Sequence, residues 1–144
     1  MNNIASPHTD DAGIEQQIQA KGKTAPRITP ARIQEVIASD HYFTAAEGVI
    51  GAFAASEFAK TSGDVILSAG STHPDLLKTG LKLLTFCVLV LRNGFTVTGE
   101  SACASPENFD AEIGKKIAFE NAKQKIWLLE GYLLKNNLAN LATV

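Results

Sequence analysis

The dipeptide Asn93-Gly94 constrains the fold of this chain more than any other feature, because it separates two stretches of strand-like composition. The stretch before it reads LTFCVLVL, and the stretch after it reads FTVTGESA. Asn-Gly is the favoured sequence for a two-residue hairpin turn, since both residues adopt a positive φ at low cost. The sequence therefore predicts an antiparallel β-hairpin.

A two-residue turn at Asn93-Gly94 also predicts the register of this hairpin, with Leu91 opposite Thr96 and Cys87 opposite Glu100. Side chains alternate between the two faces of a strand, so the register assigns each residue to a face. One face is expected to be wholly apolar and to carry Phe86, Val88, Val90, Phe95 and Val97. The other face is expected to carry Cys87, Leu89, Leu91, Thr96, Thr98 and Glu100.

The first strand is thus apolar on both faces, which is typical of a central strand in a sheet. A single hairpin cannot cover both of its faces. Another strand, a helix or a second copy of the chain must do so. We therefore name Leu89 and Leu91 as candidate oligomer-interface residues.

Helix signals flank the hairpin on both sides. Thr29 and Pro30 are the expected cap and first residue of one helix, and Thr44 with Glu47 forms a capping box for a second. The segment SDHYF between them is expected to interrupt the helical stretch. The candidate ligand- or partner-binding residues come from this corner and from the hairpin. They are His41, Tyr42, Phe43, Arg92 and Glu100.

A long last helix is expected from Pro106 to about Asn136, with Ser105 as its cap. Its second half contains IWLLEGYLL, which places apolar side chains around nearly the whole helix. A helix of this kind is usually buried on several sides. We therefore add Trp127 and Tyr132 to the predicted oligomer interface.

A chain of 144 residues favours one domain. Residues 1–27 are polar and are expected to form a flexible N-terminal arm, with a transient helix over Ile14–Ala20. Residues 28–140 are expected to form a single α+β domain. In this domain a long C-terminal helix packs on an antiparallel, hairpin-based sheet, and two further helices precede the sheet.

Composition excludes several classes of function. A net charge of −2 provides no basic surface for nucleic acid. The two cysteines form no Cys-x-x-Cys pair and the three histidines are scattered, so no metal or cofactor is predicted. Neither a signal peptide nor a membrane-spanning segment is expected, which favours a cytoplasmic protein.

The string GESAC, residues 99–103, raises the question of a hydrolase nucleophile. A nucleophile elbow needs a second glycine where this chain has Cys103, and its histidine follows the serine, whereas all three histidines here precede Ser101. An order of His73, Asp75 and Ser101 stays open, because triads are defined by geometry. Cys103 paired with His41 or His73 also stays open. The favoured interpretation has no catalytic residue, with GESAC as the exit from a strand.

The strings NGFTVTGESAC, NFDAEIG and KIW-LEGYLL lie within Leu83–Leu134, and HYFTAAEG lies upstream of them. Through these strings the chain resembles the small tailed-phage and prophage proteins named after phage gene products forty-nine and sixty-six. It departs from them at Leu128, where proline is frequent. The resemblance implies a phage or prophage origin and a role inside infected bacteria, and it carries over no catalytic residue.

Together these features predict a non-enzymatic binding module that acts as a homo-oligomer and helps the phage in its host. The expected partners are a host protein or a small nucleotide signal, with host takeover or anti-defence as the role. A virion or assembly protein is one alternative. A small hydrolase that uses Ser101 or Cys103 is the other.

Overall fold

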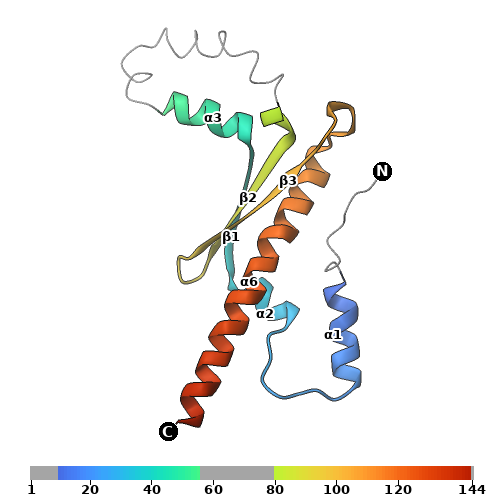
Figure 1. Cartoon of the computed structure of the whole chain (residues 1–144), viewed down its shortest axis with the longest axis vertical. Coiled ribbons are helices and arrows are strands. Elements are labelled where there is room, and N and C mark those ends of the chain that lie inside the picture. The colour runs from blue at the N-terminus through green and yellow to red at the C-terminus, as the bar shows by residue number, and fades with distance from the viewer. Residues whose placement is uncertain (1–9, 56–79, 144) are drawn as a thin grey trace.

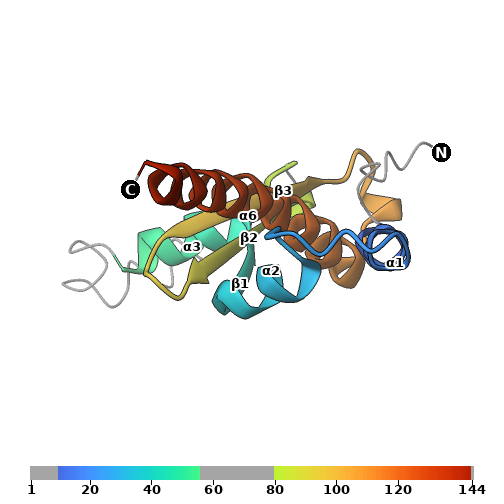
Figure 2. The same cartoon turned by 90° about the horizontal axis from the view of Figure 1, so that it is seen from below.

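The computed structural model describes residues 10–55 and 80–143 of the chain. Its helices are α1 (Asp11–Ala20), α2 (Pro30–Val36), α3 (Ala45–Ala54) and α6 (Ala111–Ala142). Its strands are β1 (Ile37–Thr44), β2 (Leu84–Leu91) and β3 (Thr96–Ala102), and two short 3₁₀ helices are η2 (Gly80–Leu83) and η3 (Pro106–Asn108). The strands form an antiparallel sheet in the order β1-β2-β3, and α6 crosses one of its faces (Figures 1 and 2). The structure confirms the predicted α+β class.

The loop between β2 and β3 holds three residues rather than the predicted two. The N–H of Leu91 donates to the carbonyl of Phe95 at 2.8 Å, and Gly94 donates back to Leu91 at 2.9 Å. Gly94 has a φ of +86°, but Asn93 does not take a positive φ. A turn followed by one left-handed glycine is a common three-residue hairpin loop. The predicted hairpin is therefore correct, and its predicted register is wrong by one residue.

This one-residue difference exchanges the faces of β3 relative to β2. Leu89 lies opposite Val97, and Cys87 lies opposite Gly99. The face under α6 is therefore formed by Cys87, Leu89, Leu91, Val97 and Gly99, all of which are buried. Val97 does not share a face with Phe86 and Val88, so the predicted grouping of apolar residues is wrong.

The segment that was expected to interrupt a helix is the edge strand β1, which pairs with β2. Tyr42 and Phe43 are residue types that strands favour, and pairing with β2 satisfies the backbone groups on one edge of this segment. Strand β1 places β2 in the centre of the sheet, as its two apolar faces predict. The face opposite α6 is then shared by three strands. We call it the outer face, formed by Ser39, His41, Phe43, Phe86, Val88, Val90, Thr96, Thr98 and Glu100.

Helix α6 covers Leu89 and Leu91 through a row of mainly small residues at intervals of four. This row consists of Gly114, Ala118, Ala122 and Ile126, and all four are buried. Small side chains let a helix approach a sheet closely. The approach is closest at Gly99, where a Cβ atom would lie 2.2 Å from the carbonyl oxygen of Ala118.

Helix α6 begins at Ala111 rather than at the predicted Pro106, and it ends at Ala142. Its cap is Asp110, whose carboxylate accepts the N–H of Ile113 at 3.0 Å. Ser105 precedes the separate 3₁₀ helix η3 and makes no capping hydrogen bond through its side chain. The predicted cap is therefore wrong, because Pro106 starts a single short turn. The caps predicted at Thr29 and Thr44 are confirmed.

We expect Asp110→Ala to lower the free energy of unfolding by about 1 kcal/mol, the usual cost of losing an N-cap. Ser105→Ala is the matched control and should change it by less than about 0.5 kcal/mol, because the side chain of Ser105 caps no helix. Urea denaturation followed by circular dichroism measures both. Equal losses in the two variants would contradict the assignment of Asp110 as the cap.

Candidate functional site

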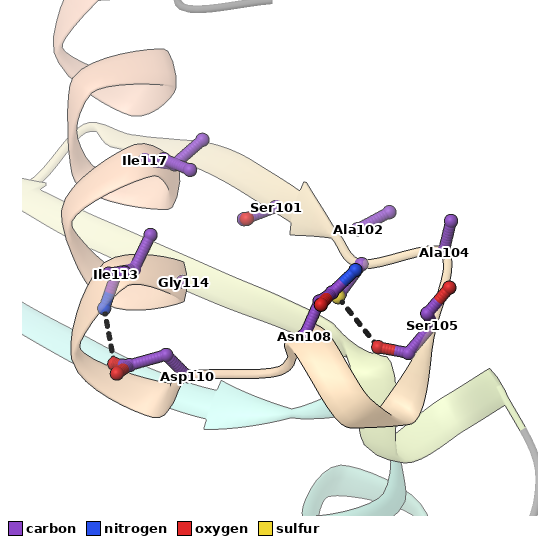
Figure 3. Close-up of a pocket in the computed structure, with 10 residues that line it drawn as sticks. Ser101, Ala102, Ala104, Ser105, Asn108, Asp110, Ile113, Gly114 and Ile117 are labelled. Carbon is purple, nitrogen blue, oxygen red and sulfur yellow. Dashed lines mark hydrogen bonds between the residues drawn. The ribbon is translucent and has the colours of Figure 1, made fainter. Parts of the chain in front are cut away.

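The GESAC string lies at a cavity of about 320 Å³ between the end of β3 and the start of α6 (Figure 3). The side chain of Ser101 points from β3 toward α6. Asn108 lies in η3 and Asp110 at the start of α6, while Ile113 and Ile117 provide an apolar wall from α6. Cys103 also lines the cavity, so both candidate nucleophiles share one small space.

The described histidine lies on the wrong side of the sheet to activate either nucleophile. Ser101 pairs with buried Thr85 on the α6 side, whereas His41 pairs with Val88 on the outer face. The thiol of Cys103 donates a hydrogen bond to the carbonyl of Ser105 at 3.1 Å. His41 therefore cannot act as a general base for Ser101 or Cys103. His73 and Asp75, which belong to the other predicted triad, lie outside the described residues.

Three of the five predicted binding residues lie together on the outer face. Phe43 and Glu100 lie in one row across the sheet, on either side of Phe86, and His41 lies in the next row. The rings of Phe43 and Phe86 stack with centroids 5.5 Å apart. Nε2 of His41 lies 3.0 Å from the hydroxyl oxygen of Ser39. The outer face thus joins an aromatic pair to polar groups at its margins.

Arg92 is separate from this group and fastens the hairpin to α2. Its backbone N–H donates to the carbonyl of Val36 at 2.9 Å, and its guanidinium donates to the carbonyl of Glu35. These carbonyls lie at the C-terminal end of α2, where a cation interacts favourably with the helix dipole. The contacts give Arg92 a structural part in the hairpin.

Tyr42 faces α6 instead of the outer face, because side chains alternate along β1. Burial, followed by a hydrogen bond with Asp40, raises the pKa of Tyr42 well above its ordinary value. Burial also raises the pKa of the Cys87 thiol, so both groups stay protonated at neutral pH. From the sequence, we did not predict that Asp40, Tyr42 and Cys87 lie together. Alternation along residues 37–44 would have revealed it once that segment was treated as a strand.

The four predicted interface residues occupy three different environments. Leu89 is fully buried and Leu91 is 7% exposed, both under α6, so a second copy of the chain is not needed to cover them. Trp127 is half-buried and packs against the core. Tyr132 is 75% exposed. Only Tyr132 of the four presents a largely free side chain.

Exposed apolar side chains gather on the second half of α6, which continues beyond the sheet (Figure 1). Ile126 is its last buried residue. We call the exposed set the apolar end of α6, formed by Leu128, Leu129, Tyr132, Leu133, Leu138 and Leu141. Leu128 and Leu141 are 78% and 72% exposed. Large exposed apolar patches are one of the features that mark interaction sites on proteins.

Within residues 10–55 and 80–143, no group of three or more His, Cys, Asp or Glu side chains is placed to hold a metal ion. None of the helices described is long and apolar enough to cross a membrane.

A model of the Phage protein (N4 Gp49/phage Sf6 gene 66) family matches residues 28–138. The comparisons with curated proteins and with solved structures find no match. Two strings that carried the resemblance, NGFTVTGESAC and NFDAEIG, meet at the cavity in Figure 3, while KIW-LEGYLL enters the apolar end of α6. Since the match covers more than half of the sequence, the chain belongs to the Phage protein (N4 Gp49/phage Sf6 gene 66) family.

Proposed function

We propose that this protein is a non-enzymatic interaction module that works as a homo-oligomer, joined through the apolar end of α6. One observation carries the proposal: the half of α6 that leaves the sheet is the half with fewer charges. Residues 111–125 contain six charged side chains, whereas residues 126–142 contain only Glu130 and Lys135. A helix in contact with water alone would show the opposite trend.

Burial of the apolar end would provide the driving force for association. Each leucine moved from water into an interface contributes about 1.5–3 kcal/mol when it is fully buried. A stable interface needs about 800 Å² from each partner. Where α6 extends past its own sheet, the exposed apolar side chains of its apolar end can supply that area to a partner.

A second copy of the chain is the occupant that we propose. The apolar end carries little charge of its own, because residues 126–142 contain one acid, Glu130, and one base, Lys135. Glu130 also accepts a hydrogen bond from Arg32 at 3.2 Å, which ties its charge to α2. Two copies can therefore meet here without repulsion between like charges.

We expect the purified protein to be a dimer or larger at micromolar concentration. The double variant Leu128→Lys/Tyr132→Lys should be a monomer, because it introduces two like charges into the contact. Multi-angle light scattering measures the mass, and circular dichroism verifies that the helices persist.

Val49→Lys is the matched control, since Val49 is 45% exposed on α3, at the other end of the molecule (Figure 1). It should leave the oligomer intact. A wild-type protein that stays monomeric at about 100 μM, where contacts with millimolar affinity begin to be occupied, would overturn the proposal.

For the role in the host, we propose that the oligomer sequesters a host protein or a small nucleotide signal, as an accessory or anti-defence protein. Membership of the phage family supports a role in infection. The aromatic and polar groups of the outer face support binding. Calorimetry with nucleotide signals and a host-protein pulldown, both with the oligomer, test this role. If neither experiment detects binding, the proposed sequestration is contradicted. The proposal that the protein is an oligomer is tested separately by its mass.

A further inference from the structure

Helix α1 lies against the beginning of α2 and the middle of α6 (Figures 1 and 2). We call the surface that it covers the Trp127 groove, formed by Ile28, Pro30, Gln124 and Trp127. Ile14 and Ile18 of α1 face this groove across a cavity of about 250 Å³. The helix is therefore seated on the groove without filling it.

Charged contacts hold α1 more than apolar burial does. Glu15 and Arg27 form a bidentate pair with N–O distances of 2.5 and 2.6 Å. Asp11 lies 3.8 Å from the ammonium of Lys123, which also pairs with Glu120 at 2.9 Å. No residue of α1 is fully buried, and Ile14 is 52% exposed. A helix of ten residues is marginal on its own in water. The packing of α1 on the Trp127 groove is thus weak, and its acidic side chains determine the orientation of the helix.

Trp127 has a polar group that α1 does not pair. The indole N–H of Trp127 is buried and has no hydrogen-bond partner among the residues that the structure describes. A buried donor without an acceptor is unfavourable. An occupant that offered a carbonyl or carboxylate oxygen to this N–H would gain a hydrogen bond that α1 does not provide.

We infer that the Trp127 groove is a docking site for an acidic amphipathic helix of a partner protein, and that α1 occupies it as a built-in competitor. The contacts of α1 define the partner's chemistry. It carries acidic residues four apart to meet Lys123 and Arg27, as Asp11 and Glu15 do. It carries apolar residues three and seven positions after the first acid, as Ile14 and Ile18 do. This surface is distinct from the apolar end of α6, so the inference goes beyond the proposed oligomer.

The electrostatics of Glu15 agree with this arrangement. Hydrogen bonds from Arg27, and then from Gln19, lower the pKa of Glu15 to about 2. The carboxylate is therefore charged throughout the physiological range. A partner helix must bring an acid of its own to replace it opposite Arg27.

The test uses the full chain with Asp11→Asn and Glu15→Gln, which removes the charges of α1 and keeps its shape. The probe is a fluorescein-labelled synthetic peptide of residues 10–21, which retains both acids. Competition from α1 lowers the apparent affinity of the groove by the fraction of time that the groove is open. We expect the double variant to bind the peptide about tenfold or more tightly than the wild type, measured by fluorescence anisotropy.

Trp127 is the only tryptophan in the chain, so its emission reports directly on the groove. In the double variant it should shift to the red, and the peptide should reverse the shift. Glu107→Gln is the matched control, because it removes an exposed acid on η3, and it should bind the peptide like the wild type. Adding Lys123→Gln to the double variant should lower its affinity for the peptide again, if the peptide binds in the Trp127 groove.

Two results would overturn the inference. One is equal peptide binding by the wild type and the double variant, or no binding by either. The other is a variant whose oligomeric mass differs from that of the wild type in light scattering, since the groove would then belong to α1 of a second copy.

Discussion

Replacing Gly99 with alanine is expected to lower the free energy of unfolding by about 3 kcal/mol or more, at or above the top of the usual range for overpacking. The added Cβ would lie 2.2 Å from the carbonyl oxygen of Ala118 and 2.3 Å from the backbone nitrogen of Ala122. Both neighbours are backbone atoms in the middle of α6, so they cannot rotate away. The helix must move off the sheet instead.

Gly131→Ala provides the matched control on α6 itself. A Cβ at Gly131 meets nothing within 4 Å. Alanine favours a helix over glycine by about 1 kcal/mol, so this variant should be slightly more stable than the wild type. Guanidinium denaturation of both variants measures the difference. Similar stabilities for the two variants would contradict the close contact between β3 and α6.

The second large effect is expected for Leu89→Ala, which should cost about 2–5 kcal/mol, the range for a buried leucine. Leu89 is fully buried between the sheet and α6, so truncation leaves a cavity. Leu128→Ala makes the same chemical change on a side chain that is 78% exposed. It should change the stability of the diluted protein by less than about 0.5 kcal/mol. Comparable losses would show that Leu89 is not in the core.

The contrast between Leu89 and Leu128 shows what could be predicted from the sequence. Composition correctly indicated that β2 is central and that surplus apolar surface exists near IWLLEGYLL. Composition could not indicate which of these apolar surfaces is covered by another part of the same chain. That depends on the small residues Gly114, Ala118 and Ala122, which lack bulk and so contribute little to a hydrophobic pattern.

The register error has an equally local cause. Asn93-Gly94 permits both a two-residue and a three-residue loop. The two-residue loop needs a positive φ at Asn93 and at Gly94, whereas the three-residue loop includes Arg92 and needs it at Gly94 alone. The hydrogen bond from the N–H of Phe95 to Oδ1 of Asn93, 3.0 Å long, accompanies the second form. The length of the loop thus decides which face Val97 and Gly99 occupy.

The candidate site was predicted least well where a strand was mistaken for a corner. His41, Tyr42 and Phe43 were expected to act together, but alternation along β1 separates Tyr42 from the other two. Polar residues at Ser39 and Asp40 hid the strand, because the pattern of β1 is not simply apolar on one face. Pairing with β2, a contact between distant parts of the chain, overrides the weak local preference.

The arrangement of the three strands also has a consequence for the order of folding. Strands β2 and β3 are joined by a three-residue loop, and α6 follows them directly in the chain. The ladder between β1 and β2 instead pairs Thr44 with Thr85, and these two residues are far apart in the sequence, with α3 and η2 between them. Local contacts form at a lower entropic cost than distant ones. We therefore expect the hairpin and α6 to form the folding nucleus and β1 to be added late. This expected nucleus coincides with the stretch Leu83–Leu134 in which the resemblance to phage proteins is concentrated.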